Sequence, residues 1–130
     1  MSIAYWCLIA AALLPYLWVL FAKLGGPRFD NLDPRGWLSR QENPRIARAN
    51  AAHLNAFEAF PMFAAGVLMA QFAGVETERV TMLALAFIAA RVLHGVFYLA
   101  NLAPLRSLAW LGGLVCTLAL MVQAALAMAG

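Results

Sequence analysis

Arginine, asparagine and glutamate side chains recur along one face of an apolar stretch, residues 48–63, which reads RANAAHLNAFEAFPMF. At 3.6 residues per turn, Arg48, Asn55 and Glu58 share one helical stripe with small alanines between them. Polar groups are costly inside hydrocarbon, and those that occur there usually serve binding or catalysis. We therefore expect this stripe to face other helices. His53 and Asn50 point elsewhere, either toward a second protein contact or toward the lipid headgroups.

A second polar group follows in the next apolar stretch. Arg91, His94 and Tyr98 are spaced i, i+3 and i+7, so they share one side of a helix. Counted at 1.5 Å per residue, Glu58 lies roughly 18–20 Å from the start of its helix and Arg91 about 15 Å from the end of the next. These similar depths predict that Glu58 and Arg91 pair, within one chain or across a subunit boundary. Alternatively, the pair only fixes helix packing.

A third group, Arg106 and Ser107, lies just after Pro104, in the first turn of the last apolar stretch. Helix N-termini carry free N–H groups and positive partial charge, so arginines beside them form a site for an anion or a thiolate. We expect such a site between helices, toward one membrane surface. The residues expected at its mouth are Arg48, Asn55, His94, Tyr98, Arg106 and Ser107.

The composition indicates an integral membrane protein. Of the 130 residues, 65% are hydrophobic and 12% charged, against about a quarter charged in soluble domains. Six of the nine basic residues lie between Lys23 and Arg48, which is a topology signal and not a nucleic-acid footprint. Cys7 and Cys116 stand alone without metal-ligand spacing, so we expect buried small hydrophobic residues and no metal site.

The elements that must position these groups are four spanning helices in one domain, residues 1–130. Breaks at glycine, proline and charged clusters place the helices at about 2–24, 44–73, 78–100 and 104–128, with a loop at 25–43. Asn43 and Pro44 read as the N-cap and first position of the second helix, and Thr77 as the cap of the third. Pro15 and Pro61 are expected to bend their helices. The fold class is therefore all-α, an integral membrane four-helix bundle subunit.

The basic residues also predict an orientation. With four spans, the 25–43 loop and the 101–106 turn share one side, and the termini share the other. The positive-inside rule makes the basic loop side cytoplasmic and places the termini outside. We therefore expect a multi-pass membrane protein.

Three motifs occur together: R-x-N-x-x-H-x-N-x-x-E-x-x-P at residues 48–61, A-R-V-x-H-x-x-x-Y at 90–98 and P-x-R-S at 104–107. Their joint pattern resembles the MAPEG family, the membrane-associated proteins of eicosanoid and glutathione metabolism. The chain is short, like many bacterial members, so the resemblance implies a bacterial inner membrane. The resemblance implies a homotrimer that binds glutathione, a co-substrate, between subunits near the cytoplasmic side. It implies that Arg106, with Ser107 beside it, stabilises the thiolate. The residues implied to hold the tripeptide are Arg48, Asn55, Glu58, Arg91, His94 and Tyr98.

The implied activity is that of a glutathione transferase or a glutathione peroxidase-like enzyme, in which the thiolate attacks a small apolar electrophile that arrives from the bilayer. The chain departs from glutathione-using members at Ala51, where they carry a second arginine one turn after Arg48. The alternative function is therefore a non-enzymatic trimeric membrane protein that keeps the scaffold without glutathione chemistry. A channel is disfavoured because the polar residues cluster toward one side and line no full path.

Overall fold

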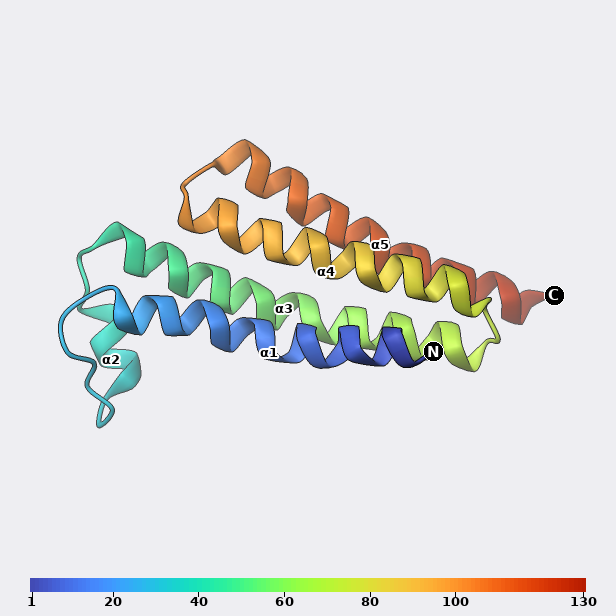
Figure 1. Ribbon diagram of the computed structural model, residues 1–130, viewed down its shortest axis with the longest axis horizontal. Helices are drawn as coiled ribbons and strands as arrows, with labels where there is room; N and C mark the ends of the chain where they lie inside the picture. Colours follow the sequence, from blue (N-terminus) through green and yellow to red (C-terminus); the bar gives the residue numbers. More distant parts are fainter.

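The computed structural model describes residues 1–130 as an all-α chain, which confirms the predicted fold class. Four long helices run back and forth: α1 (Ser2–Leu24), α3 (Pro44–Phe72), α4 (Thr77–Leu99) and α5 (Ala103–Ala129). A short helix, α2 (Pro34–Ser39), lies in the loop between the first two. Both termini lie at the end of the bundle opposite this loop (Figure 1).

Three of the long helices, α1, α4 and α5, are long and apolar enough to cross a membrane. The fourth, α3, has 29 residues, and its first half carries the polar stripe of Arg48, Asn55 and Glu58. These side chains make α3 less apolar than its neighbours. The chain is thus a multi-pass membrane protein with three to four helical spans.

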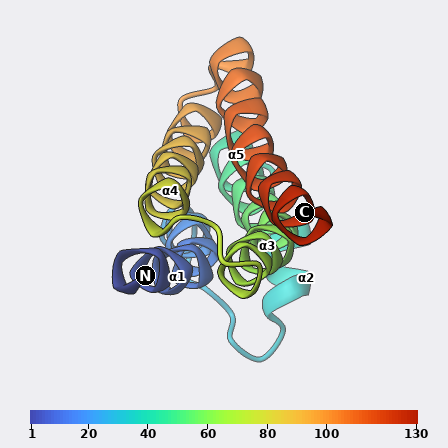
Figure 2. The same cartoon turned by 90° about the vertical axis from the view of Figure 1, so that its right-hand side faces the viewer.

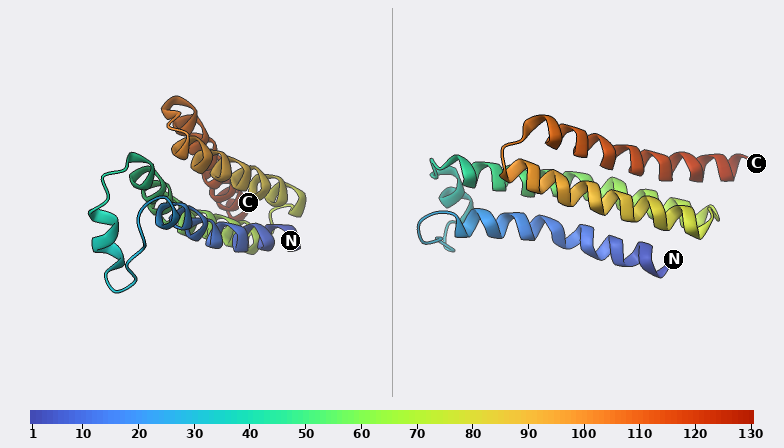
Figure 3. Two further views of the ribbon diagram at one scale, coloured as in Figure 1. Left: turned by 60° about the vertical axis from the view of Figure 1, so that its left-hand side comes forward. Right: turned by 45° about the horizontal axis from the view of Figure 1, so that its top comes forward.

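Viewed along its length, the bundle places α1, α3, α5 and α4 in order around a central core (Figure 2). The largest core cluster lies in the half nearer the termini, where the Phe63 and Phe87 rings stack with centroids 3.8 Å apart. Toward the loop end, the α4–α5 pair diverges from α1 and α3 (Figures 1 and 3). α3, α4 and α5 line a cavity between them.

Small residues allow α1 to lie close to its neighbours. Ala11 and Ala22 of α1 and Ala52 of α3 are buried. Gly95 of α4 is buried against Trp18, and a Cβ added to this glycine would lie 2.0 Å from the indole ring. Close approach through small side chains is the usual way in which membrane helices pack.

The loop between α1 and α3 folds back onto the bundle. The Trp37 indole N–H donates to the Arg28 carbonyl at 3.0 Å, and the side chain is 4% exposed, against Ile46 and Ala49 of α3. Asp33 caps α2 by accepting from the Gly36 N–H, and the Arg40 guanidinium beside it lowers the pKa of this exposed carboxyl. Trp37 therefore anchors the loop to the protein.

The start of α3 agrees with its sequence signal, and the start of α4 does not. Asn43 caps α3 by accepting from the Arg45 N–H at 3.0 Å, and Pro44 is the first helical residue. In α4, Glu76 takes the N-cap position without a side-chain cap, and Thr77 is already helical. The prediction of Thr77 as the cap was wrong because the helix begins one residue earlier than expected. Glu76 is the last non-helical residue, and its carboxylate lies 3.0 Å from the Arg79 guanidinium.

Candidate functional site

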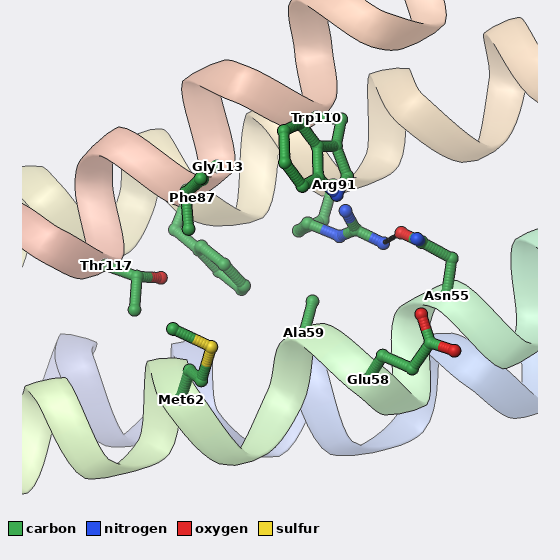
Figure 4. Close-up of a pocket in the computed structure, with 10 residues that line it drawn as sticks. Asn55, Glu58, Ala59, Met62, Phe87, Arg91, Trp110, Gly113 and Thr117 are labelled. Carbon is green, nitrogen blue, oxygen red and sulfur yellow. Dashed lines mark hydrogen bonds between the residues drawn. The ribbon is translucent and has the colours of Figure 1, made fainter.

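The deeper of two adjoining cavities lies between α3, α4 and α5 and has a volume of about 190 Å³ (Figure 4). Its floor is apolar and its loop-facing end is polar. α3 lines one side, and α4 and α5 line the other. The lining residues are Asn55, Glu58, Ala59, Met62, Phe87, Arg91, Trp110, Gly113, Leu114 and Thr117.

Arg91 is the buried charge at this polar end. Its side chain is 3% exposed, and one guanidinium nitrogen donates to the Asn55 side-chain oxygen at 2.6 Å (Figure 4). Gly113 gives the arginine its room, since a Cβ there would lie 3.3 Å from the Arg91 Cδ. Hydrogen bonds to a charged group are among the stronger ones in proteins. This hydrogen bond therefore joins α4 to α3.

Within the chain, Glu58 does not form the ion pair predicted with Arg91. The two salt bridges of the chain are those of Arg40 with Asp33 and of Arg79 with Glu76, both exposed. Asn55, one turn before Glu58 on the same stripe, takes the guanidinium instead. Glu58 is exposed and lines the cavity, so its carboxylate is free for another partner. Pairing across a subunit boundary stays a prediction.

The outer cavity lies nearer the loop end and has a volume of about 180 Å³. The Arg106 guanidinium carbon lies 4.4 Å from the centroid of the Tyr98 ring, a cation–π contact that holds the arginine in place. The His94 ring meets the same tyrosine edge-on at 5.5 Å. His94 is buried, and its Nδ1 has no hydrogen-bond partner. The lining residues are Asn55, His94, Tyr98, Arg106, Ser107 and Trp110.

The two cavities share Asn55 and Trp110. Polar and cationic groups thus gather in the outer cavity and at the entrance of the deeper one, with apolar walls behind them. Such a site favours an anion near Arg106 and an apolar group further in. No group of three or more His, Cys, Asp and Glu residues lies close enough to hold a metal ion.

The structure brings together five of the six residues expected at the mouth, and Arg48 is the exception. It lines a separate cavity with Arg45, between the end of α1, the start of α3 and the end of α4. Arg48 lies two turns before Asn55 on the stripe, level with the end of α4. Within one chain, its side chain therefore faces different neighbours.

The sequence left open whether His53 contacts protein or the lipid headgroups, and the structure shows a protein contact. The His53 Nδ1 lies 2.8 Å from the Pro15 carbonyl oxygen of α1, so the residue makes a second protein contact on the far side of α3. The Phe57 ring also packs edge-on against the His53 ring, with centroids 5.0 Å apart. His53 thus joins α3 to α1 and takes no part in the two cavities.

Sequence reasoning missed the α5 wall of the deeper cavity. Trp110, Gly113 and Thr117 follow Arg106 at i+4, i+7 and i+11, which places all of them on one helical stripe. Thr117 is the one polar side chain between Ser107 and Gln123, and Gly113 lies one turn before it. This break in an apolar stretch was the available signal.

A comparison with known protein families identifies the family of the chain. The MAPEG family model matches residues 3–126, nearly the whole chain, including all the residues that line the two cavities. No curated protein matches the chain.

Proposed function

The chain belongs to the MAPEG family, and we propose that it is a glutathione-dependent transferase that activates the thiolate of glutathione toward apolar electrophiles. The family includes enzymes of this kind and typically forms trimers. The observation that carries the proposal is the outer cavity, in which Arg106 lies beside Tyr98, Ser107 and the unpartnered His94.

The groups around the cavities fit the chemistry of glutathione, a tripeptide with two carboxylates, an amino group and a thiol. Arg106 and Arg91 supply the cations for anionic groups, and Glu58 supplies a carboxylate for the ammonium. Asn55 and Tyr98 offer neutral hydrogen-bonding groups. Arg48 lies outside this set within one chain, so any part it takes would come across a subunit boundary.

Thiolate activation follows from the position of Arg106. A free thiol has a pKa of about 8.5 and is mostly protonated at neutral pH, while the thiolate is the reactive nucleophile. A guanidinium and the N-terminal turn of α5 both favour the anion. The Ser107 hydroxyl, next to Arg106 in the outer cavity, can donate a hydrogen bond to the sulfur.

The electrophile is expected to be apolar and to enter from the bilayer. The deeper cavity is lined by Met62, Phe87, Trp110 and Leu114, which suits a hydrocarbon group. In the reaction, the thiolate sulfur forms a bond to an electrophilic carbon. That carbon either expels a leaving group with its electron pair or passes the electrons to a neighbouring atom, which takes a proton.

The test is a calorimetric titration of reduced glutathione into the detergent-purified protein. Arg106→Ala should abolish thiolate absorbance in the ultraviolet at neutral pH and weaken binding. Arg79→Ala is the matched control, because Arg79 lies at the opposite end of the bundle in an exposed salt bridge with Glu76. The absence of binding to the well-folded wild type at millimolar glutathione would refute the proposal.

The second candidate is a non-enzymatic membrane protein that uses its polar groups only for packing. Two observations favour it: Arg91 already has a partner within the chain, and Ala51 replaces the second arginine of the stripe. In this case Glu58 pairs across a subunit boundary only to fix packing, and Glu58→Gln should lower stability in detergent by the same amount with and without glutathione. For the transferase, added glutathione should stabilise the wild type more than the variant.

A further inference from the structure

A third cavity lies at the loop end of the bundle, apart from the two cavities described above. It has a volume of about 490 Å³ and shares no residue with them. It forms where α1 ends, α3 begins and α4 ends, so three helix ends surround it. The lining residues are Phe21, Gly25, Asn43, Arg45, Arg48, Ala49, Leu99 and Ala100.

Two arginines give this cavity a positive charge that nothing in the chain neutralises. Neither Arg45 nor Arg48 takes part in either of the two salt bridges, and none of the lining residues is acidic. The Arg48 Nε is buried and has no hydrogen-bond partner. A buried donor without a partner is costly, so this guanidinium is suited to an external acceptor.

The charge comes from the side chains and not from free N–H groups at the start of α3. The Arg45 N–H donates to the Asn43 side chain, and the Ile46 N–H donates to the Asn43 carbonyl at 3.1 Å. Pro44 has no N–H to offer. The first turn of α3 is therefore already satisfied, and an anion in the cavity would depend on the two guanidinium groups.

The other walls of the cavity are apolar. Phe21, in the last turn of α1, is 51% exposed, and Leu99 closes the opposite side from the last turn of α4. Both helices are long and apolar enough to span the membrane, so their ends lie where hydrocarbon meets headgroups. Cationic and apolar walls at this depth match an amphiphile with an anionic head.

We propose that this cavity binds the phosphodiester headgroup of an anionic phospholipid from the leaflet at the loop end. Arg45 and Arg48 hold the phosphate oxygens, and Phe21 and Leu99 contact the first carbons of the acyl chains. Guanidinium groups are well suited to phosphate because they donate two parallel hydrogen bonds. Free phosphate offers the same oxygens but leaves the apolar walls uncovered, so the lipid is the favoured source.

The test is a titration of detergent-purified protein with phosphatidylglycerol, followed by native mass spectrometry, with phosphatidylcholine as the comparison lipid. Arg48→Gln and Arg45→Gln should each weaken phosphatidylglycerol binding by about fivefold, the effect of one basic residue near an anionic surface. Arg48→Lys keeps the charge and should retain most of the affinity. Arg35→Gln is the matched control, because it removes an exposed arginine at the same end, outside the cavity.

Three results would overturn the proposal. The first is equal binding of phosphatidylglycerol to the wild type and the Arg45→Gln/Arg48→Gln double variant, each folded by circular dichroism. The second is displacement of the lipid by millimolar inorganic phosphate, which would assign the cavity to the free ion. The third is loss of glutathione binding in Arg48→Gln with lipid binding unchanged, which would show that Arg48 binds glutathione and not lipid.

Discussion

The hydrogen bond between Arg91 and Asn55 satisfies the one charged side chain buried between the helices. The guanidinium is buried, and the 2.6 Å contact with Asn55 is its one hydrogen bond within the chain. A buried charge without a partner is far costlier than a paired one. The stability of the α3–α4 contact should therefore depend on the asparagine more than on the exposed Glu58.

Asn55→Ala is predicted to lower the free energy of unfolding in detergent by about 1.5–3 kcal/mol, the range for a hydrogen bond to a charged group. Asn50→Ala is the control, since Asn50 lies in the same helix and its side chain makes no hydrogen bond within the chain. Chemical denaturation of both variants without glutathione measures the difference. Equal stability of the two would show that Arg91 finds another partner.

At this scale, the sequence predicted where the charges lie but not how they pair. Helical spacing correctly indicated that Glu58 and Arg91 occupy similar depths, and both line the deeper cavity. It did not distinguish Glu58 from Asn55, which lies one turn earlier on the same stripe. Which of the two side chains binds Arg91 depends on the angle between α3 and α4 and on side-chain rotamers. Residue spacing in the sequence gives no information about either.

The helices meet through small residues, and Gly95 is the tightest of these contacts. Trp18 of α1 lies against it so closely that any side chain would displace the indole. Because Trp18 also packs on Ala52 and Ala56 of α3, the displacement would loosen α1 from both of its neighbours.

Gly95→Ala is predicted to destabilise the protein by about 1–3 kcal/mol, as overpacking in a filled core usually does. Gly112→Ala is the control, because its added Cβ would meet only the Ala90 side chain at 3.8 Å. Thermal unfolding of both variants in the same detergent tests the prediction. A Gly95→Ala protein as stable as Gly112→Ala would mean that Trp18 repacks without cost.

Helix boundaries were predictable where a proline or a capping side chain fixes the backbone, as at Asn43 and Pro44. The start of α4 was harder to predict, because Glu76 occupies the N-cap position without a side-chain hydrogen bond. The burial of Trp37 against α3 was not predicted either. Interfacial tryptophan is common in membrane proteins, but here the indole binds the Arg28 carbonyl and packs on α3.

For the whole molecule, the charge pattern predicts that the loop between α1 and α3 faces the cytoplasm. Arg35→Cys, in exposed α2, should react with a membrane-impermeant maleimide only after cells are lysed. Gly130→Cys, at the opposite end, should react in intact cells. The wild type gives the background from Cys7 and Cys116, which are buried and half-buried. The reverse labelling pattern would contradict this orientation.

The number of subunits is the part of the architecture that residue patterns do not determine. Alanine and glycine allow close packing, but they do not set the number of subunits. The number comes from the family, which typically forms trimers. The exposed Glu58 carboxylate at the cavity is the group for which a subunit boundary would matter most, since its partner is absent from its own chain.

The measurement that tests the central claim most directly is the pH dependence of thiolate absorbance for glutathione bound to the purified protein. The account predicts that Arg106 lowers the pKa of the bound thiol below its ordinary value of about 8.5, so that thiolate is present at neutral pH. In Arg106→Ala the absorbance should appear only at higher pH, as for free glutathione. An unshifted thiol pKa in the saturated wild type would contradict the account.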